Sequence, residues 1–258
     1  MKFLKFLVII IFSIHFFLFG KVFAAGPKIE YPEKNWSFST IFGSFDKASA
    51  QRGFQVYKEV CAGCHGMRLV SYRNLAALGY NQEELKAIAA QFEINDGPND
   101  EGEMFTRSGR PSDKFLSPYP NDQAARAANG GAYPPDLSLI IKARPNGANY
   151  LHALLSGYEE APKNIKVPEG MYYNKFYSGN LIAMPQPLYE DGVEYLDGTK
   201  ASKDQMATDV TTFLAWASEP ELEERKQLGV TVILFLIVFS ILSYFSMRQI
   251  WAPIKNKN

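Results

Sequence analysis

The sequence of 258 residues has little cysteine, little histidine and no net charge. With two cysteines in all, it has no disulfide framework that could brace its loops. Basic and acidic residues number 27 each, which argues against a nucleic-acid-binding protein. Internal repeats and low-complexity tracts are absent. With 47% hydrophobic and 21% charged residues, the chain is neither disordered nor a membrane protein with many spans.

The zero net charge hides an uneven distribution. Residues 1–24 contain three lysines and no acid, and residues 248–258 contain three basic residues and no acid. The stretch between them therefore holds 21 of the 27 basic residues and all 27 acidic residues, a net charge of −6. This acidic stretch predicts that a protein partner, where one binds, is basic.

The N-terminus has the order of features typical of an export signal. Two lysines precede an apolar run of 14 residues, Phe6 to Phe19, and Val22-x-Ala24 follows as a cleavage sequence. These features predict a cleaved signal peptide over residues 1–24. A transmembrane helix is the weaker alternative because a span needs about 20 apolar residues. An organelle transit peptide does not fit because the segment has no arginine.

The C-terminal region predicts a membrane anchor. Residues 228–247 form a run of 20 residues without a charge, long enough to cross about 30 Å of hydrocarbon as a helix. Export of the N-terminus and the basic tail both orient this helix with its C-terminal end in the cytoplasm. We therefore expect a periplasmic domain over residues 25–227, an anchor over 228–247 and a cytoplasmic tail over 248–258.

Between signal and anchor the sequence predicts helices joined by long loops. Apolar residues recur at spacings of three and four, and Ser202 and Gln205 predict a capping box at the start of the last helix. Regions 95–120 and 158–200 are rich in glycine, proline and aspartate and are expected to be loops. The expected helices cover residues 46–60, 81–92, 122–128, 150–155 and 202–217.

The string Cys61-Ala62-Gly63-Cys64-His65 contains both cysteines of the chain. Two thiols about one helical turn apart suit the two vinyl groups of a haem, and the adjacent imidazole suits its iron, so the string predicts covalent haem c. Three alternatives have less support. A disulfide across two residues is strained, a thioredoxin-like redox pair needs a βαβ context, and a zinc site needs more ligands than this region offers.

The second axial ligand of such a haem is less clear from spacing. Met184 lies in Ala183-Met184-Pro185-Gln186-Pro187, where two prolines stiffen the loop, and it is the favoured candidate. His152, Met104 and Met171 remain open. Met67 follows His65 too closely to reach the far face of the ring, and Met206 fits the apolar stripe of the last helix.

Four separated strings resemble the cytochrome c1 family, the haem subunits of quinol–cytochrome c oxidoreductase (cytochrome bc1) complexes. The resemblance extends from about Tyr31 to Arg248, and the last string joined to an anchor is the most specific. The strings are Arg52-Gly53-Phe54-Gln55-Val56-Tyr57 leading into Cys61–His65; Ala125–Asn129 with Pro134-Pro135-Asp136-Leu137-Ser138; Ile182-Ala183-Met184-Pro185; and Phe213–Pro220.

The resemblance implies thioether attachment through Cys61 and Cys64, with His65 as proximal and Met184 as distal ligand. It also implies that Arg126 lies near a haem propionate. The implied fold is mainly α, a cytochrome c-like helical haem domain with long loop insertions plus one C-terminal transmembrane helix.

The implied function is electron transfer from a Rieske iron–sulfur protein, in a complex with cytochrome b, to a soluble or anchored cytochrome c. The subunit is not an enzyme on its own. The implied location is a bacterial inner membrane, with the haem domain in the periplasm. Two alternatives remain at this stage: a haem subunit of another complex such as a terminal oxidase, and a haem sensor or enzyme with an open sixth position.

Overall fold

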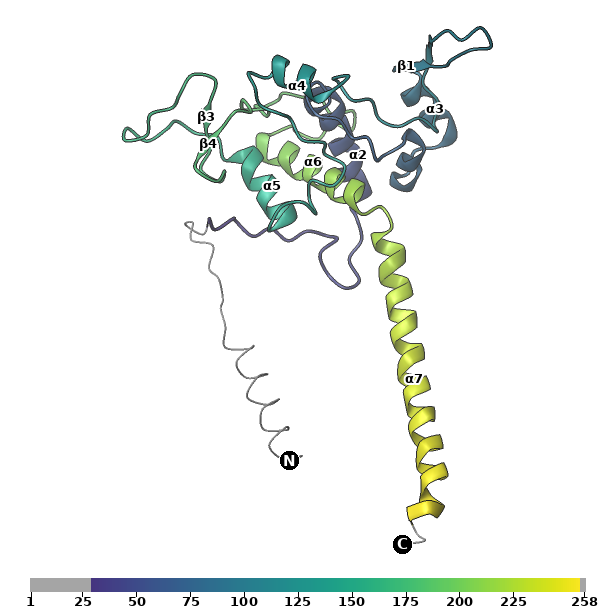
Figure 1. Cartoon of the computed structure of the whole chain (residues 1–258). Coiled ribbons are helices and arrows are strands. Elements are labelled where there is room, and N and C mark those ends of the chain that lie inside the picture. The colour runs from purple at the N-terminus through teal and green to yellow at the C-terminus, as the bar shows by residue number, and fades with distance from the viewer. Residues whose placement is uncertain (1–28, 256–258) are drawn as a thin grey trace, which may run out of the picture. The chain divides into compact units, whose positions relative to one another are not determined.

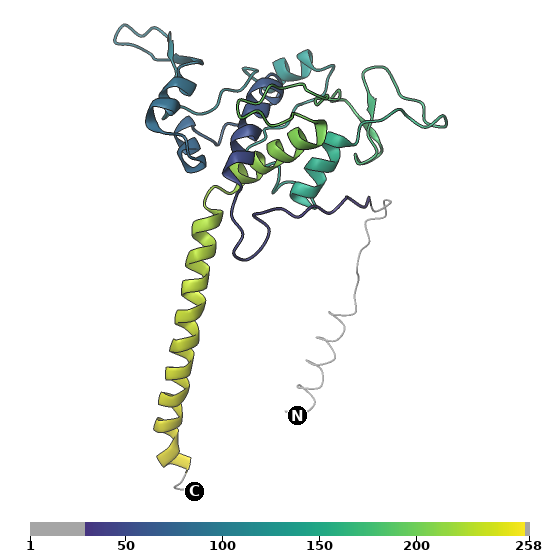
Figure 2. The ribbon, with the colours of Figure 1, turned by 180° about the vertical axis from the view of Figure 1, so that it is seen from behind.

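The computed structural model describes residues 29–255, so the expected signal peptide and the last three residues of the tail lie outside it. Figures 1 and 2 show a mainly helical domain followed by one long helix. The helices are α2 (Lys47–Val56), η1 (Tyr57–Cys61, a π-helical turn), η2 (Tyr72–Leu78, a 3-10 helix), α3 (Gln82–Ala89), α4 (Asp122–Ala128), α5 (Gly147–Ser156), α6 (Lys203–Ser218) and α7 (Leu222–Lys255).

The five expected helices are confirmed, with local differences at their ends. The bounds of α4 match the expectation, and Asn121 caps it by accepting a hydrogen bond from the Ala124 amide. Helix α5 begins one turn earlier than expected, after Asn146 in the left-handed conformation. At α6, Ser202 caps the helix by accepting from the Gln205 backbone amide. The prediction of a reciprocal bond from the Gln205 side chain is wrong, because its side-chain amide donates to Asp209 instead.

The two regions expected to be loops each contain a short antiparallel ladder. Strand β1 (Glu93–Asp96) pairs with β2 (Phe105–Ser108) in the register Glu93 to Ser108. Strand β3 (Tyr172–Tyr173) pairs with β4 (Leu181–Ile182). These strands are only two to four residues long, too short to show the alternation that identifies a strand in sequence.

The core forms where α2 crosses α6, with α5 packed on the other side of α6 (Figure 1). Gly53 permits the crossing, because a Cβ at this position would lie 2.0 Å from the Asp209 carbonyl oxygen. Aromatic rings fill the space beside the crossing, with Phe54 and Tyr57 each within 6 Å of Phe213. Such ring pairs stabilise a fold by about 0.5–1.5 kcal/mol beyond their burial.

A buried ion pair fixes the same crossing. Asp209 is fully buried and accepts hydrogen bonds from the Arg52 Nε at 2.9 Å and the Ser49 hydroxyl at 2.7 Å. Bonding to Asp209 raises the pKa of Arg52, which therefore stays charged. The Arg52 Nη2 and the Gln205 side-chain amide also donate to this carboxylate. Because both of its oxygens are hydrogen-bonded, the charge is tolerated inside the fold.

Helix α7 has the length and composition of a membrane span. Residues 222–254 have a mean hydropathy of 2.5 over the most apolar window, and no part of that window is buried. The helix extends beyond residues 228–247 at both ends and includes Arg248 and Trp251.

Candidate functional site

The two cysteines and His65 lie on one turn that continues α2 and η1. The Cys61 carbonyl accepts hydrogen bonds from the Cys64 amide at 3.1 Å and the His65 amide at 2.9 Å. The Tyr57 carbonyl accepts from the Ala62 amide at 2.8 Å. These bonds hold the turn in a helical conformation, so the three reactive side chains come from one compact segment.

The His65 ring is fixed by a backbone carbonyl 70 residues away. Its Nδ1 lies 2.8 Å from the Pro135 carbonyl oxygen. Because a carbonyl oxygen can only accept, Nδ1 carries the proton, and Nε2 keeps its lone pair. Burial lowers the pKa of His65, so the ring is neutral near pH 7. A neutral imidazole with a free Nε2 is the form that binds iron or another metal.

Three hydrogen bonds hold residues 135–138 against the chain that follows His65, and a fourth lies within residues 135–138. The Asp136 carboxylate accepts from the Arg68 amide at 3.0 Å and from the Ser138 amide at 2.9 Å. The Ser138 hydroxyl accepts from the Leu69 amide at 3.1 Å, and the Leu137 amide donates to the Gly66 carbonyl at 2.9 Å. The Pro-Pro-Asp-Leu-Ser string thus positions the carbonyl that orients the imidazole.

The two thiols differ in their surroundings. Both are free, with Cys61 half-buried and Cys64 exposed. Burial raises the pKa of the Cys61 thiol to about 12, so it is protonated rather than a reactive thiolate. A thioredoxin-like pair needs the opposite, a lowered thiol pKa beside a parallel sheet, and the strand pairs in the described part of the chain are antiparallel.

The zinc alternative also finds no support in the described residues. Among them, no three histidine, cysteine or acidic side chains are arranged so that they could hold a metal ion together. His152, the only other histidine of this region, lies on α5 with its Nε2 3.0 Å from an Asp204 carboxylate oxygen and 3.3 Å from the Lys34 ammonium. The same contacts engage the nitrogen with which His152 would otherwise bind a haem iron.

Met184 follows β4 and is half-buried against the hydrophobic core, which Cys61 also contacts. Its carbonyl accepts a hydrogen bond from the Tyr158 hydroxyl at 3.0 Å. A second bond, from the Gln186 side-chain amide to the Leu188 carbonyl at 2.7 Å, closes the loop after Met184. This proline-containing loop is therefore held by specific contacts on both sides of the methionine.

The other described methionines before α7 differ from Met184 in burial or in packing. Met206 and Met67 are fully buried, which confirms the core interpretation of Met206. Met104 is 66% exposed between β1 and β2, and Met171 is half-buried ahead of β3. Met184 alone among the three loop methionines considered as ligands packs against the core cluster.

Arg126 lies on the exposed side of α4. Its guanidinium donates to the Gly131 carbonyl at 3.1 Å and lies 5.3 Å from the Tyr133 ring centre. Both contacts leave donors of the guanidinium free, since this group carries five N–H bonds. The side chain can therefore still bind an anionic group.

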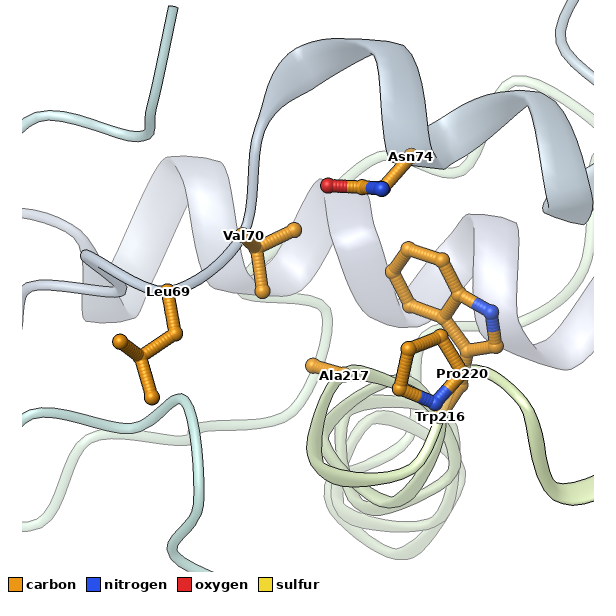
Figure 3. Close-up of a pocket in the computed structure, with 6 residues that line it drawn as sticks. All are labelled: Leu69, Val70, Asn74, Trp216, Ala217 and Pro220. Atoms are coloured by element: carbon orange, nitrogen blue, oxygen red, sulfur yellow. The ribbon is translucent and has the colours of Figure 1, made fainter.

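A small cavity lies where the chain after His65 meets the end of α6. Figure 3 shows its lining, with Asn74 above the Trp216 and Pro220 rings and Leu69 and Val70 to one side; Ala217 completes it. Its volume of about 90 Å³ is below the roughly 300–1,000 Å³ of typical ligand sites. We assign it no ligand.

Sequence reasoning did not find the roles of Pro135, Asp136 and Ser138. A carbonyl oxygen has no signature in sequence, and residues 134–138 stand out in the sequence only through a family resemblance. The signal that could have found it is the unsatisfied Nδ1 of a metal-binding histidine, which nearly always has a hydrogen-bond acceptor.

Comparison with known proteins identifies relatives over most of the chain. A family described as "Cytochrome C1 family" matches residues 36–254. "Cytochrome c1 1, heme protein, mitochondrial" of Arabidopsis thaliana is 52% identical over 229 residues, covering 89% of this chain and 75% of the relative. "Cytochrome c1" of Rhodospirillum rubrum is 48% identical over 240 residues, covering 87% and 88%. "Cytochrome b-c1 complex catalytic subunit, mitochondrial" of Candida albicans is 48% identical over 235 residues, covering 91% and 82%.

Proposed function

Because the chain belongs to the cytochrome c1 family, we propose that it is the haem-bearing electron-transfer subunit of a quinol–cytochrome c oxidoreductase, the cytochrome bc1 complex. The cofactor is haem c, in keeping with relatives named as heme proteins. The reaction belongs to the complex, and this subunit carries electrons within it.

The side chains of Cys61, Cys64 and His65 fit covalent haem c. Two free thiols on one turn supply the thioether positions at Cys61 and Cys64. The observation that carries the proposal is the bond between His65 Nδ1 and the Pro135 carbonyl, because it leaves Nε2 as an iron ligand. His65 is the proximal ligand in this proposal.

Met184 is the distal ligand and Arg126 a propionate partner. Support for Met184 comes from its fixed loop and its contact with the core. Support for Arg126 comes from its position on α4 and its free donors, which suit a carboxylate. Neither residue needs to move a proton for electron transfer.

The chemistry that the bound haem supplies is one-electron oxidation and reduction. The protein side chains tune and protect this chemistry. With haem bound, His65 and Met184 would hold its iron, and a thioether ligand would raise the reduction potential. The Asp136 and Ser138 bonds hold the Pro135 carbonyl that orients the His65 ring.

The partners follow from the complex. Electrons arrive from a Rieske iron–sulfur subunit and leave to a soluble or anchored cytochrome c, while cytochrome b shares the membrane with α7. Helix α7 supports a single-pass anchor. The haem domain lies in the periplasm of a bacterium, with the basic tail in the cytoplasm.

Purification of the native complex through an affinity tag on this chain tests the proposal. We expect cytochrome b and an iron–sulfur subunit to copurify, and quinol to reduce a haem that stays on this chain after acid–acetone extraction. A chain that purifies without cytochrome b, or a haem that extraction removes, would contradict the proposal.

A further inference from the structure

The loop before α2 carries the two most exposed large apolar side chains of its region. Ile41 is 74% exposed and Phe42 is 84% exposed, and residues 35–45 contain no charged side chain. Isolated apolar residues on a surface are ordinary. An uncharged loop with an adjacent isoleucine and phenylalanine at its tip is more unusual and calls for a covering surface.

The loop has a defined shape. The Gly43 amide donates to the Thr40 carbonyl at 3.0 Å, so Ile41 and Phe42 are the two central residues of a turn. Below the turn, the Phe38 and Phe45 rings pack with their centres 5.0 Å apart. A Cβ on Gly43 would lie 2.3 Å from the Ser37 carbonyl oxygen, so only glycine allows the two arms of the loop to approach.

Lys226 of α7 fixes this loop to the anchor. Its ammonium donates to the Phe38 carbonyl at 2.7 Å, the Thr40 carbonyl at 2.6 Å and the Gly43 carbonyl at 3.0 Å. An ammonium has three donors, and all three are used. One turn earlier on α7, the Glu223 carboxylate accepts from the Phe45 amide at 2.8 Å.

These contacts give the loop a direction along α7. Phe45 lies at the level of Glu223, and the carbonyls on both sides of the tip lie at the level of Lys226, nearer to the apolar run. Lys226 precedes Leu228, where that run begins, by two residues, or about 3 Å along the helix axis. The apolar faces of amphipathic helices that lie in the membrane interface bury about 5–10 Å into the headgroup–acyl boundary, which sets the depth that apolar side chains reach there. The tip is therefore within reach of the lipid surface.

We propose that Ile41 and Phe42 insert into the headgroup–acyl boundary of the membrane leaflet facing the haem domain. Lys226 holds the inserted turn against α7. The loop is then a second membrane contact beside the anchor, and it limits rotation of the haem domain about α7. The inference rests on α7 crossing the membrane and does not depend on the haem chemistry.

A fluorine label on the full-length chain in lipid nanodiscs tests this inference. The label is trifluoromethylphenylalanine, and the discs contain phosphatidylethanolamine and phosphatidylglycerol. It replaces Phe42, Phe239 in the middle of α7, or Leu196, which is 98% exposed on a loop with no bond to α7. NMR measures broadening by dissolved oxygen, which concentrates in lipid, and by a nickel chelate that stays in water.

We expect the ratio of the oxygen effect to the nickel effect at Phe42 to exceed that at Leu196 several-fold and to fall below that at Phe239. Equal ratios at Phe42 and Leu196 would overturn the proposal while leaving the anchor intact. A low ratio at Phe239 would overturn the anchor and the loop contact together. In the purified complex, a label at Phe42 shielded from both agents would show that a protein partner covers the loop, and would also overturn it.

Lys226→Ala tests directly whether this lysine holds the loop against α7. The ratio at Phe42 should move toward the value at Leu196, because the three carbonyls lose their donor, while Phe239 should not change. Lys175→Ala is the matched control, since that lysine pairs with Glu159 at 3.2 Å on the surface, and it should change nothing. An unchanged ratio at Phe42 in Lys226→Ala would show that the lysine does not place the loop.

Discussion

At the scale of single residues, one backbone carbonyl decides how His65 can act. The Pro135 oxygen accepts from Nδ1, and the protonation of the ring follows from that contact. The carbonyl is itself held by the side chain of Asp136, which accepts two backbone amides. The orientation of the His65 ring therefore depends on an aspartate that is not among the proposed ligands.

Asp136→Ala should loosen the Pro135 carbonyl and leave the His65 ring less well oriented. We expect covalent haem to remain, while the low-spin ferric signal in electron paramagnetic resonance broadens and the midpoint potential shifts. Loss of partners that orient a ligand histidine typically weakens metal binding about 10–100-fold. Asp136→Asn keeps an acceptor oxygen and should retain most of the native signal, whereas Asp122→Ala, in the first turn of α4, should have no effect. Native signal and potential in Asp136→Ala would remove this role.

Met184→Leu should open the sixth position of the iron, because leucine has the volume of methionine but no sulfur. We expect carbon monoxide to bind the reduced protein and the potential to fall by about 100 mV or more, within the range of about 0.8 V that axial ligands span. Redox titration and carbon monoxide difference spectra measure both effects. Met104→Leu, at an exposed site, is the control. If Met184→Leu is silent, the distal ligand is Met104, Met171 or His152.

At the scale of elements, the crossing of α2 and α6 depends on a missing side chain. Gly53→Ala would place a Cβ 2.0 Å from a backbone oxygen of α6 and 2.7 Å from the Phe213 Cβ. Overpacking of this kind typically costs about 1–3 kcal/mol, and we expect the upper end because backbone cannot rotate away. Denaturant unfolding followed by circular dichroism measures the loss. Gly229→Ala, whose Cβ would have no neighbour within 4 Å, should cost less than about 0.5 kcal/mol. Equal costs would exclude the crossing as the cause.

The β1–β2 hairpin is tied to the following loop by Arg107. Its guanidinium binds both oxygens of Asp113, at 2.6 and 2.9 Å, and also contacts Asp96. Bonding to Arg107 lowers the pKa of Asp113 to about 2. The unfolded value is near 3.9, so the stabilisation is complete above about pH 5 and is lost as the pH falls through about 4 to 2.

This ion pair predicts a pH-dependent signal from Arg107. Its guanidinium Nη–H resonances should be sharp at pH 5 and broaden as the pH falls toward 2, because protonated Asp113 no longer accepts from both Nη groups. Asp113→Asn should give the broad signal already at pH 5. Asp100→Asn, at an exposed site without an ion pair, should follow the native profile. A sharp resonance in Asp113→Asn would assign the restraint to Asp96 alone.

At the scale of the whole molecule, the acidic charge of residues 25–247 predicts steering of a basic electron acceptor. Asp100, Glu101 and Glu103 are exposed on the β1–β2 loop, whereas the nearby Asp96 is paired with Arg107 and contributes less. An electron carrier must dock and leave quickly, and long-range attraction raises its encounter rate without a tight interface.

The second-order rate of electron transfer to a basic cytochrome c should therefore fall steeply between about 0.01 M and 0.15 M salt, as the Debye length shrinks from about 30 to 8 Å. Replacing Glu101 and Glu103 by glutamine should flatten this dependence without changing the haem spectrum. Stopped-flow measurements at several ionic strengths give the slope. A rate independent of salt in the native protein would contradict steering.

Local signals in the sequence determined much of this protein. The bounds of α4, the caps at Asn121 and Ser202, the apolar anchor and the Cys61–His65 string could all be identified in advance. Each depends on residues that follow one another along the chain, where spacing alone fixes which side chains share a face. The short strands escaped notice because two to four residues carry no periodicity.

Only the tertiary structure decided which distant segments meet. The Pro135 carbonyl reaches His65 across 70 residues, Arg52 reaches Asp209 across 157, and Lys226 reaches the loop at Gly43 across 183. The Gln205 side chain does not form the predicted capping bond for the same reason. It donates instead to the Asp209 carboxylate, which lies at the crossing of α2 and α6. Carbonyls and buried carboxylates take whichever donors packing brings near. Their partners follow from the arrangement of helices in space, which no local spacing encodes.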